Sequence, residues 1–217
     1  MSPVNKLRVR RRRFAPLLAG LAVGAVLLSG CSSDPLAEQY REGSGKGFIA
    51  GDGSVTEIAL SDRGQAVEFS GVTESGDPVT SADTLGEVLV VNFWYASCAP
   101  CRAEAADLQS LNAQFENDGA SFLGVNVRDQ APNAIAFNDT YGVTYPSVLD
   151  VDAGAMQLAF SGSIPPNAVP TTLVVDAQGR VAARILGQVT SPSILETLIR
   201  DTIAENDGAS SDGGATE

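Results

Sequence analysis

The chain of 217 residues contains no histidine and only three cysteines, Cys31, Cys98 and Cys101. Protein zinc sites draw most of their ligands from cysteine and histidine. The closely spaced pair Cys98 and Cys101 would therefore need two further soft or nitrogen ligands, which this sequence does not offer. We expect no metal site, and nothing in the sequence indicates another cofactor.

Basic residues are scarce beyond the first thirty positions. Residues 1–30 hold six of the fourteen Lys and Arg and none of the 26 Asp and Glu, so their removal would change the net charge from −12 to −18. Nucleic-acid binding requires positive charge to neutralise phosphates, so we expect no nucleic-acid partner. Anionic lipid headgroups would also repel this acidic body, and the acidity itself favours solubility.

Long apolar runs are absent as well, and the longest stretch of apolar or small residues covers only residues 14–30. That length is short of the roughly 20 residues of a membrane-spanning helix. With the basic residues that precede it, the stretch is typical of an export signal. It ends in Leu-Ser-Gly-Cys31, which resembles the bacterial lipobox. We expect a lipoprotein signal peptide over residues 1–30 and lipidation of Cys31, with an uncleaved signal anchor as the alternative.

Polar, glycine-rich sequence flanks the predicted core on both sides. Residues 31–53 include "EGSGKGFIAGDG" and are expected to form a lipidated N-terminus and a flexible tether with a reach of about 25 Å. Residues 206–217 contain no apolar residue larger than alanine and are predicted to be a disordered acidic tail. One domain is expected between them, over residues 54–205.

Strand and helix patterns alternate through this core. The apolar run at 88–94 is typical of a central strand buried on both faces, and 66–72 is predicted to be an edge strand. A hairpin and a final helix close the pattern, which indicates an α/β sandwich with a mixed sheet. The other predicted strands are 121–127, 147–149, 171–176 and 181–186. One helix is predicted to begin near Pro100, and three more are predicted at 132–141, 153–159 and 191–204.

The sequence Cys98-Ala99-Pro100-Cys101 lies where the central strand gives way to a helix. Unpaired backbone N–H groups and the helix dipole favour a thiolate at a helix N-terminus, so Cys98 is the expected nucleophile. A purely structural disulfide is possible, but it would close too short a loop to stabilise the fold much. The spacing favours a redox couple, in which the thiolate of Cys101 attacks a mixed disulfide formed by Cys98.

Helical spacing places a carboxyl group beside the cysteines. Cys101, Glu104, Leu108, Leu111 and Phe115 follow steps of three and four residues and share one stripe of the helix. A carboxyl group within an apolar stripe loses solvation, which raises its pKa and lets it exchange a proton during thiol-disulfide exchange. The alternative is a glutamate at the edge of the stripe that reaches water.

The segment "VVNFWYASCAPCRAE" resembles the thioredoxin superfamily, most closely its membrane-anchored TlpA/ResA-like thiol-disulfide oxidoreductases, over about residues 65–204. The resemblance implies a thioredoxin-like sandwich with an internal helix-strand insertion around residues 131–160. It also implies that Cys98 attacks, that Cys101 resolves and that Glu104 tunes the pair.

The same resemblance assigns residues around the cysteine pair. Asn92 stands where ordinary thioredoxins have a buried aspartate, a replacement that is common in the TlpA/ResA-like branch. Val169-Pro170 matches a cis-proline that faces the disulfide, with Val169 offering backbone groups to an extended substrate, although an ordinary trans turn is the alternative. Trp94 matches a tryptophan beside the active site that contacts substrates, with simple packing as the alternative.

The resemblance implies a lipid-anchored enzyme at the extracytoplasmic face of the cell membrane that reduces protein disulfides, with cytochrome c maturation as a candidate process. Its expected partners are disulfide-bearing protein substrates, a membrane electron donor of the thiol-reducing type, and the membrane through the lipid on Cys31. The direction of electron flow depends on the reduction potential. A redoxin-type peroxidase and a non-enzymatic copper-binding module on the same fold are the alternatives, although the copper module would lack its usual histidine.

Overall fold

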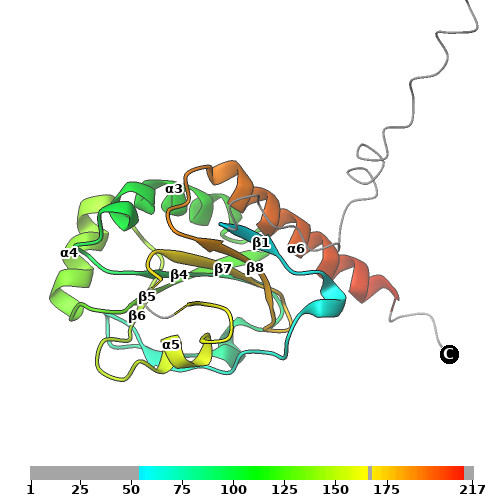
Figure 1. Ribbon diagram of the computed structural model, residues 1–217, viewed down its shortest axis with the longest axis horizontal. Helices are drawn as coiled ribbons and strands as arrows, with labels where there is room; N and C mark the ends of the chain where they lie inside the picture. Colours follow the sequence, from blue (N-terminus) through cyan, green and yellow to red (C-terminus); the bar gives the residue numbers. More distant parts are fainter. Residues whose placement is uncertain (1–53, 166–167, 213–217) are drawn as a thin grey trace, which may run out of the picture. The chain divides into compact units, whose positions relative to one another are not determined.

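The computed structural model describes residues 54–165 and 168–212, and Figure 1 shows them as a central sheet with helices on both faces. The six strands of this sheet follow the order β1-β8-β7-β4-β5-β6. The pairs β4·β5 and β5·β6 are parallel, and the remaining pairs are antiparallel. The sheet is therefore mixed, as predicted. Its strands are β1 (Val55–Glu57), β4 (Val88–Trp94), β5 (Ala120–Asn126), β6 (Ser147–Leu149), β7 (Thr171–Val175) and β8 (Val181–Leu186).

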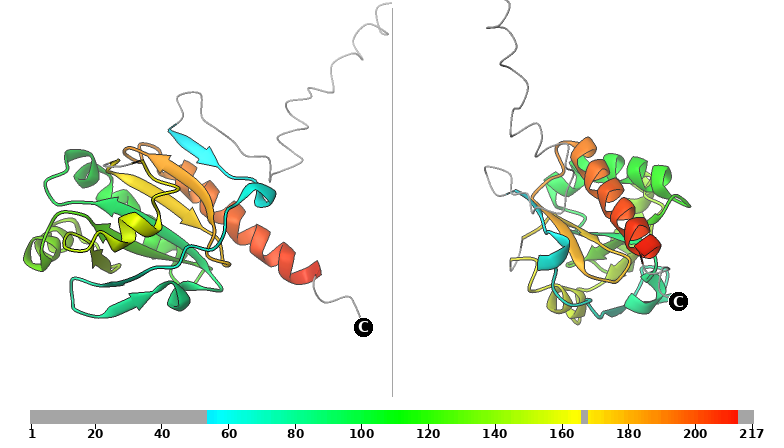
Figure 2. Two further views of the ribbon diagram at one scale, coloured as in Figure 1. Left: turned by 60° about the horizontal axis from the view of Figure 1, so that its bottom comes forward. Right: turned by 90° about the vertical axis from the view of Figure 1, so that its right-hand side faces the viewer.

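The helices divide between the two faces of the sheet. In Figure 2, α6 runs beside α3 on one side, and α5 lies on the other. The segment between β5 and β7 contains α4, β6 and α5, which confirms the helix-strand insertion. The remaining elements are α3 (Ala99–Phe115), α4 (Ala131–Tyr141), α5 (Ala155–Ala159), α6 (Pro192–Asp212), the short 3-10 helices η1 (Leu60–Asp62) and η2 (Ser81–Thr84), and the hairpin strands β2 (Ser70–Val72) and β3 (Pro78–Thr80).

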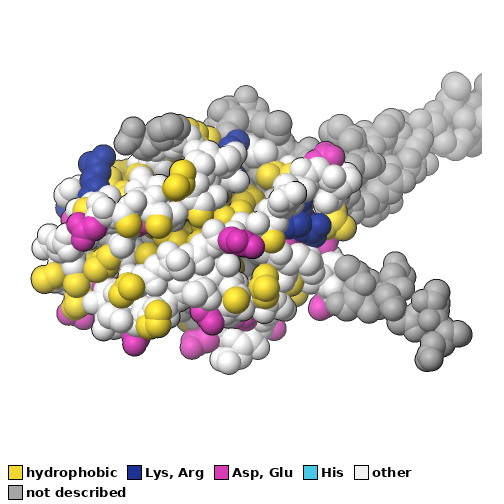
Figure 3. All heavy atoms as spheres, turned by 90° about the horizontal axis from the view of Figure 1, so that it is seen from below, with side chains coloured by type: hydrophobic (Ala, Val, Ile, Leu, Met, Phe, Trp, Pro, Cys, Tyr) yellow, Lys and Arg dark blue, Asp and Glu magenta, His cyan; other side chains and the backbone are white. Residues whose placement is uncertain are grey.

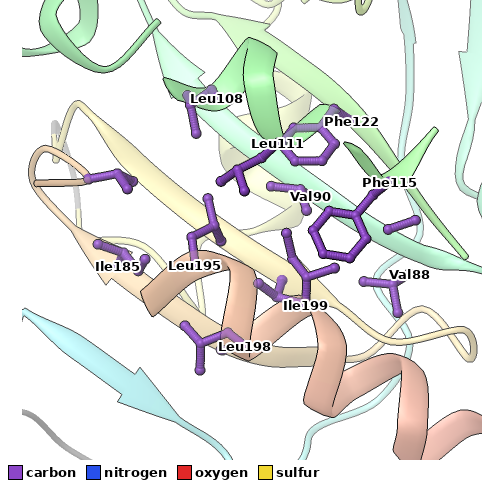
Figure 4. Close-up of a cluster of buried hydrophobic side chains, with 14 of the residues drawn as sticks. Val88, Val90, Leu108, Leu111, Phe115, Phe122, Ile185, Leu195, Leu198 and Ile199 are labelled. Carbon is purple, nitrogen blue, oxygen red and sulfur yellow. The ribbon is translucent and has the colours of Figure 1, made fainter. Parts of the chain in front are cut away.

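Strand β4 is buried along its whole length because both of its faces are covered. Val88 and Val90 pack with α3 and α6 in the cluster drawn in Figure 4, where Phe115 and Ile199 come from those two helices. The alternate side chains of β4 enter a second core beneath the sheet. The strand thus matches the continuous apolar run from which it was predicted, and it ends at the cysteine pair.

The prediction of an edge strand over residues 66–72 is wrong in extent and in place. Only the last three of these residues form a strand, β2, which pairs with β3 in a separate two-stranded sheet. Phe69 lies in the core beneath the sheet, and the backbone N–H of Val67 donates to the carbonyl of Gly179 in a turn. At the β8 side of the six-stranded sheet the edge strand is β1. This strand is too short and too polar to show an alternating pattern.

Helix α6 also differs from its prediction, since it continues to Asp212 instead of ending at about Ala204. Apolar residues repeat along this helix only as far as Ile203, which packs against the core. Periodicity therefore reveals only the packed part of the helix. No proline follows to stop the backbone, so residues 206–212 of the predicted tail are helical in this structure.

A buried arginine ties three distant segments together. The Arg63 side chain is 2% exposed, and its Nη1 donates to Asp176 Oδ2 at 3.1 Å. Its Nη2 donates to Glu205 on α6, and its Nε donates to the carbonyl of Ile58 at 3.1 Å. Arg63 thus joins the chain before β2, the β7–β8 turn and α6.

We expect Arg63→Ala to lower the free energy of unfolding by roughly 3 kcal/mol, because it removes one partner from a buried ion pair. Asp176 would keep its second partner, Arg180, whose Nη2 lies 2.8 Å from Asp176 Oδ2. The loss of stability should therefore lie at the lower end of the range for broken buried ion pairs. Urea denaturation measures the change. Arg200→Ala is the control, because its pair with Glu196 is exposed to solvent and should contribute little to stability. Equal losses in the two variants would contradict this account.

Candidate active site

The cysteine pair joins the end of β4 to the start of α3. Cys98 is the N-cap of α3, and its Sγ accepts a hydrogen bond from the backbone N–H of Cys101 at 3.2 Å. The two cysteines form a disulfide, with an S–S distance of 2.05 Å and a Cα–Cα distance of 5.2 Å. The sulfur of Cys98 therefore lies where helix N–H groups stabilise a thiolate after reduction.

The surroundings of the two cysteines differ. Both cysteines are buried, with exposed fractions of 3% for Cys98 and 2% for Cys101, but the two neighbours of Cys98, Ser97 and Ala99, are exposed. Cys101 is on the inner face of α3, with the buried residues Glu104 and Leu108 on the same stripe. The roles of Cys98 as the attacking thiol and Cys101 as the resolving thiol stay predictions.

The loop before β7 lies against the same cluster. The Val169–Pro170 peptide bond is cis, and half-buried Val169 packs against the buried group that includes both cysteines. The structure confirms the predicted isomer, and the trans turn is excluded. Val169 thus packs against the cysteine cluster, and contact of its backbone with a substrate stays a prediction.

Trp94 occupies an interior position at the end of β4. Only 4% of its surface is exposed, and its ring centroid lies 4.2 Å from that of Phe137 on α4. Its Nε1 donates to Ser147 Oγ at 3.2 Å. Trp94 therefore packs in the interior, as the alternative interpretation of this residue predicts. Direct contact of Trp94 with a substrate stays a prediction.

Glu104 is fully buried, with an exposed fraction of 0%. Its Oε2 accepts the backbone N–H of Val189 at 2.7 Å, and its Oε1 accepts the Asn92 side-chain amide at 3.0 Å. The alternative of a glutamate that reaches water is therefore wrong. The carboxyl group is held between β4, α3 and the loop that follows β8.

This burial sets the acidity of Glu104. Loss of solvation raises its pKa from 4.5 to about 7, the two hydrogen bonds oppose that rise, and the charge of Asp107 adds to it. A group with this pKa gains or loses a proton readily at neutral pH. Glu104 lies one helical turn after Cys101, and proton exchange between its carboxyl group and the resolving thiol stays a prediction.

A small cavity lies on the inner side of Cys101. It has about 10 Å³ of space for the centre of a water molecule, which is room for about one water. Asn92 and Tyr145 contribute polar groups to its wall. Its other lining residues are Trp94, Cys101, Ala105, Leu108, Phe137, Asn138, Val143 and Ser147.

A loop contact before Cys98 escaped the sequence analysis. Asp129, which follows β5, accepts the backbone N–H of Ala96 at 2.6 Å through its Oδ2. Asn126 supports it, since its side-chain amide donates to the same oxygen at 3.0 Å. Because β4 and β5 pair in parallel, their carboxyl ends meet at the same edge of the sheet. Only the prediction of these two neighbouring strands could have indicated this contact from the sequence.

The family model described as AhpC/TSA family matches residues 63–184, which is more than half of the chain. The chain belongs to the AhpC/TSA family. Several curated proteins to which it is similar carry thiol-disulfide names. Thiol-disulfide oxidoreductase ResA of Bacillus subtilis is 27% identical over 136 residues, which cover 63% of this chain and 73% of that protein. Thiol:disulfide interchange protein HelX of Rhodobacter capsulatus is 34% identical over 122 residues, which cover 56% of this chain and 65% of HelX.

Solved structures agree with this family assignment. A secreted thiol-disulfide isomerase from Corynebacterium glutamicum superposes with a TM-score of 0.63 at 33% identity, covering 71% of this chain and 96% of that one. A DsbF homologue from Corynebacterium diphtheriae gives a TM-score of 0.61 at 34% identity, covering 70% and 96%. The comparisons confirm the thioredoxin-like fold and the ResA-like resemblance. This member of the family is a thiol-disulfide oxidoreductase.

Two further features bear on earlier expectations. Among the described residues, no group of three or more His, Cys, Asp or Glu could hold a metal ion. No helix within 54–165 or 168–212 combines the length and apolar character needed to cross a membrane. Cys31 and the predicted signal peptide lie outside the described residues.

Proposed function

We propose that this oxidoreductase is lipid-anchored at the extracytoplasmic face of the cell membrane and reduces protein disulfides there. The observation that carries the reaction is the Cys98–Cys101 pair at the N-terminus of α3, with buried Glu104 one turn further along the same face. The cis peptide before Pro170 lies against the same cluster and supports a substrate held in extended form beside the sulfurs.

In the proposed reaction the reduced enzyme supplies two electrons. The Cys98 thiolate attacks one sulfur of the substrate disulfide, so a mixed disulfide forms and one substrate thiolate leaves. Cys101 then loses its proton to Glu104, and its thiolate attacks Cys98 Sγ. That attack releases the second substrate thiolate and forms the Cys98–Cys101 disulfide. A membrane protein with a thiol pair would reduce this disulfide by the same exchange.

The direction of electron flow is tested by the reduction potential of the Cys98–Cys101 pair. We expect a value closer to the roughly −270 mV of thioredoxin than to the roughly −120 mV of a strong oxidant. Equilibration of the full chain with glutathione buffers, followed by thiol alkylation and mass analysis, gives the potential. A value near that of the strong oxidant would assign the enzyme to disulfide formation and would reject the reductase proposal.

Apocytochrome c, whose cysteines must be thiols before haem attachment, is the candidate substrate that the ResA-like resemblance suggests. Capture in the host with the Cys101→Ser variant would identify the partner, because the mixed disulfide on Cys98 would not be resolved. An apocytochrome among the captured proteins would support this assignment. A captured set without any apocytochrome would reject this substrate and would leave the exchange reaction itself standing.

The anchor rests on the sequence Leu-Ser-Gly-Cys31 at the end of the apolar stretch. The similar Corynebacterium glutamicum protein is described as secreted, which supports an extracytoplasmic location for this chain too. Mass spectrometry of the protein from host membranes is expected to show residue 31 as an acylated N-terminus. A mature protein that retains residues 1–30 would reject the lipoprotein proposal.

A redoxin-type peroxidase, the alternative already considered from the sequence, is the second candidate for a member of the AhpC/TSA family. The Cys98–Cys101 disulfide and the thiol-disulfide names of the similar proteins favour exchange between protein thiols. Peroxide consumption that persists undiminished in Cys101→Ser would favour the peroxidase instead, because such an activity requires only one cysteine.

A further inference from the structure

The described residues contain far more carboxyl groups than arginines, and most of those arginines are already engaged. Arg63 and Arg180 bond to Asp176, and Arg200 bonds to Glu196. Arg184 donates to the carbonyl of Ser163 and to Thr56. Figure 3 shows one face of the molecule, on which Asp and Glu side chains lie at several places and Lys or Arg side chains at few.

The two remaining arginines of the described part of the chain are Arg102, which is next to Cys101 in sequence, and Arg128, which contacts the loop that leads into Cys98. Arg102 directly follows Cys101 in the first turn of α3, and its side chain is exposed. Arg128 follows β5 and is exposed too. Within the described residues neither arginine has a carboxylate at ion-pair distance, although the chain offers many carboxylates.

Arg128 is held in place and does not extend freely into solvent. Its guanidinium carbon lies 4.1 Å from the centroid of the Tyr95 ring, a distance typical of a cation–π contact. Tyr95 is half-buried and packs against the group that contains both cysteines. The positive charge is therefore fixed on the loop that leads into Cys98.

The carboxylates near Arg128 form no ion pair with it among the described residues. Asp129, its sequence neighbour, keeps its negative charge, but its Oδ2 accepts hydrogen bonds from the Ala96 N–H and the Asn126 amide. Glu104 is fully buried beneath the pair. The other residues around the sulfurs, Ser97, Ala99, Val169 and Pro170, carry no charge.

We propose that Arg102 and Arg128 select partners that carry Asp or Glu beside their reacting cysteines. This inference rests on the proposed exchange function and adds a substrate class to it. The acidic body of the chain would repel an acidic partner at long range, and the positive charges of Arg102 and Arg128 would offset that repulsion near the cysteine pair. Within the described part of the chain, Asp129 is the one ionised carboxylate that contacts the loop leading into Cys98. Such complementarity acts mainly on the rate of encounter and weakens as salt is added.

Three disulfide-linked peptides that differ only in the residues flanking their cysteines test the proposal. One carries Glu, one carries Lys and one carries Gln, and the rate at which each oxidises the reduced full chain is measured by stopped flow. At about 10 mM salt we expect the Glu peptide to react about tenfold faster than the Lys peptide. The ratio should approach one in about 0.5 M NaCl, where charges are screened.

Variants separate selectivity from reactivity. The double variant Arg102→Glu, Arg128→Glu is expected to react faster with the Lys peptide than with the Glu peptide. Every rate is divided by the rate with the Gln peptide, which removes any change in the reactivity of Cys98 itself. Arg200→Glu, which makes the same charge change on α6, should leave the ratio unaltered. A wild-type ratio of one at low salt, or the same shift from Arg200→Glu, overturns the selectivity proposal alone. Failure of all three peptides to react would instead overturn the proposed function.

Discussion

Cys98→Ser is expected to lower the rate of protein-disulfide reduction by about a thousandfold or more, to the uncatalysed background. The substitution removes the sulfur that the N-terminus of α3 activates, and Cys101 lies on the inner face of that helix. No other cysteine is expected to replace Cys98, since Cys31 is the predicted lipidated N-terminus, ahead of the tether, and Cys101 lies on the inner face of α3. Reduction of insulin disulfides by the pre-reduced full chain measures the loss.

Cys31→Ser is the matched control for this result. It removes a thiol by the same chemical change but leaves the cysteine pair at the helix intact, so the rate with a soluble substrate should stay within about twofold of the wild type. A Cys98→Ser variant that keeps a tenth or more of the activity would contradict the assignment of Cys98 as the attacking group.

Glu104→Gln is expected to change how stability depends on pH. The pKa of Glu104 is about 7 in the folded protein, against 4.5 for an unperturbed glutamate. Between these two values the folded state keeps a proton that the unfolded state has lost. The free energy of unfolding should therefore fall as pH rises from about 4.5 to 7, by about 3 kcal/mol for the whole shift, and should level off above pH 7.

Glutamine has no proton to lose, so the variant should lack this decline. Relative to wild type it should gain about 3 kcal/mol between pH 4.5 and pH 8, a difference that urea denaturation of the oxidised proteins measures. Glu116→Gln is the control, because Glu116 is exposed at the end of α3. A difference between wild type and Glu104→Gln that stays constant with pH would contradict the account of a buried, titrating carboxyl group.

The same substitution should slow the resolving step. Without a carboxylate one turn from Cys101, the thiol must lose its proton to water, and we expect a loss on the order of 100-fold at pH 8. The wild-type resolution rate should rise as Glu104 loses its proton around pH 7 and flatten above it, whereas the variant should show no such inflection, because its rate follows only the ionisation of the thiol. A structural role alone would change the stability and leave the pH profile of the rate intact.

Asn92 explains how one carboxyl group can titrate alone in this core. Its amide donates to Glu104 Oε1 and to Thr172 Oγ1, both at 3.0 Å. An aspartate at this place would bring a second carboxyl group close to Glu104, and the two would titrate as a coupled pair. The asparagine instead supplies a neutral hydrogen bond that partly offsets the cost of burying Glu104.

The parts of the site that follow from local spacing could be predicted from the sequence. The apolar run of β4, the Cys-Ala-Pro-Cys sequence after it and the stripe from Cys101 to Phe115 each depend on neighbours a few residues apart. Periodicity left open whether Glu104 reaches water. The structure excludes that alternative, because Asn92 and Val189 close over the carboxyl group.

Features that depend on distant segments could not be predicted in this way. The N–H of Val189 reaches Glu104 from a loop 85 residues further along the chain, and no side-chain pattern marks a backbone donor. Strand β1 is defined by its pairing with β8, since three residues are too few for a period. Residues 66–69 have the composition of a strand, but tertiary packing of Phe69 beneath the sheet decides their path.

The central claim is that Cys98 and Cys101 act in sequence as attacking and resolving thiols. Mass analysis of the reduced Cys101→Ser full chain after reaction with a disulfide-linked peptide tests it most directly. The account predicts a stable adduct with one peptide chain, mapped to Cys98, and no such adduct on wild type, where Cys101 releases it. An adduct mapped to Cys31, or no adduct under conditions in which the wild type reduces the peptide, would contradict the claim.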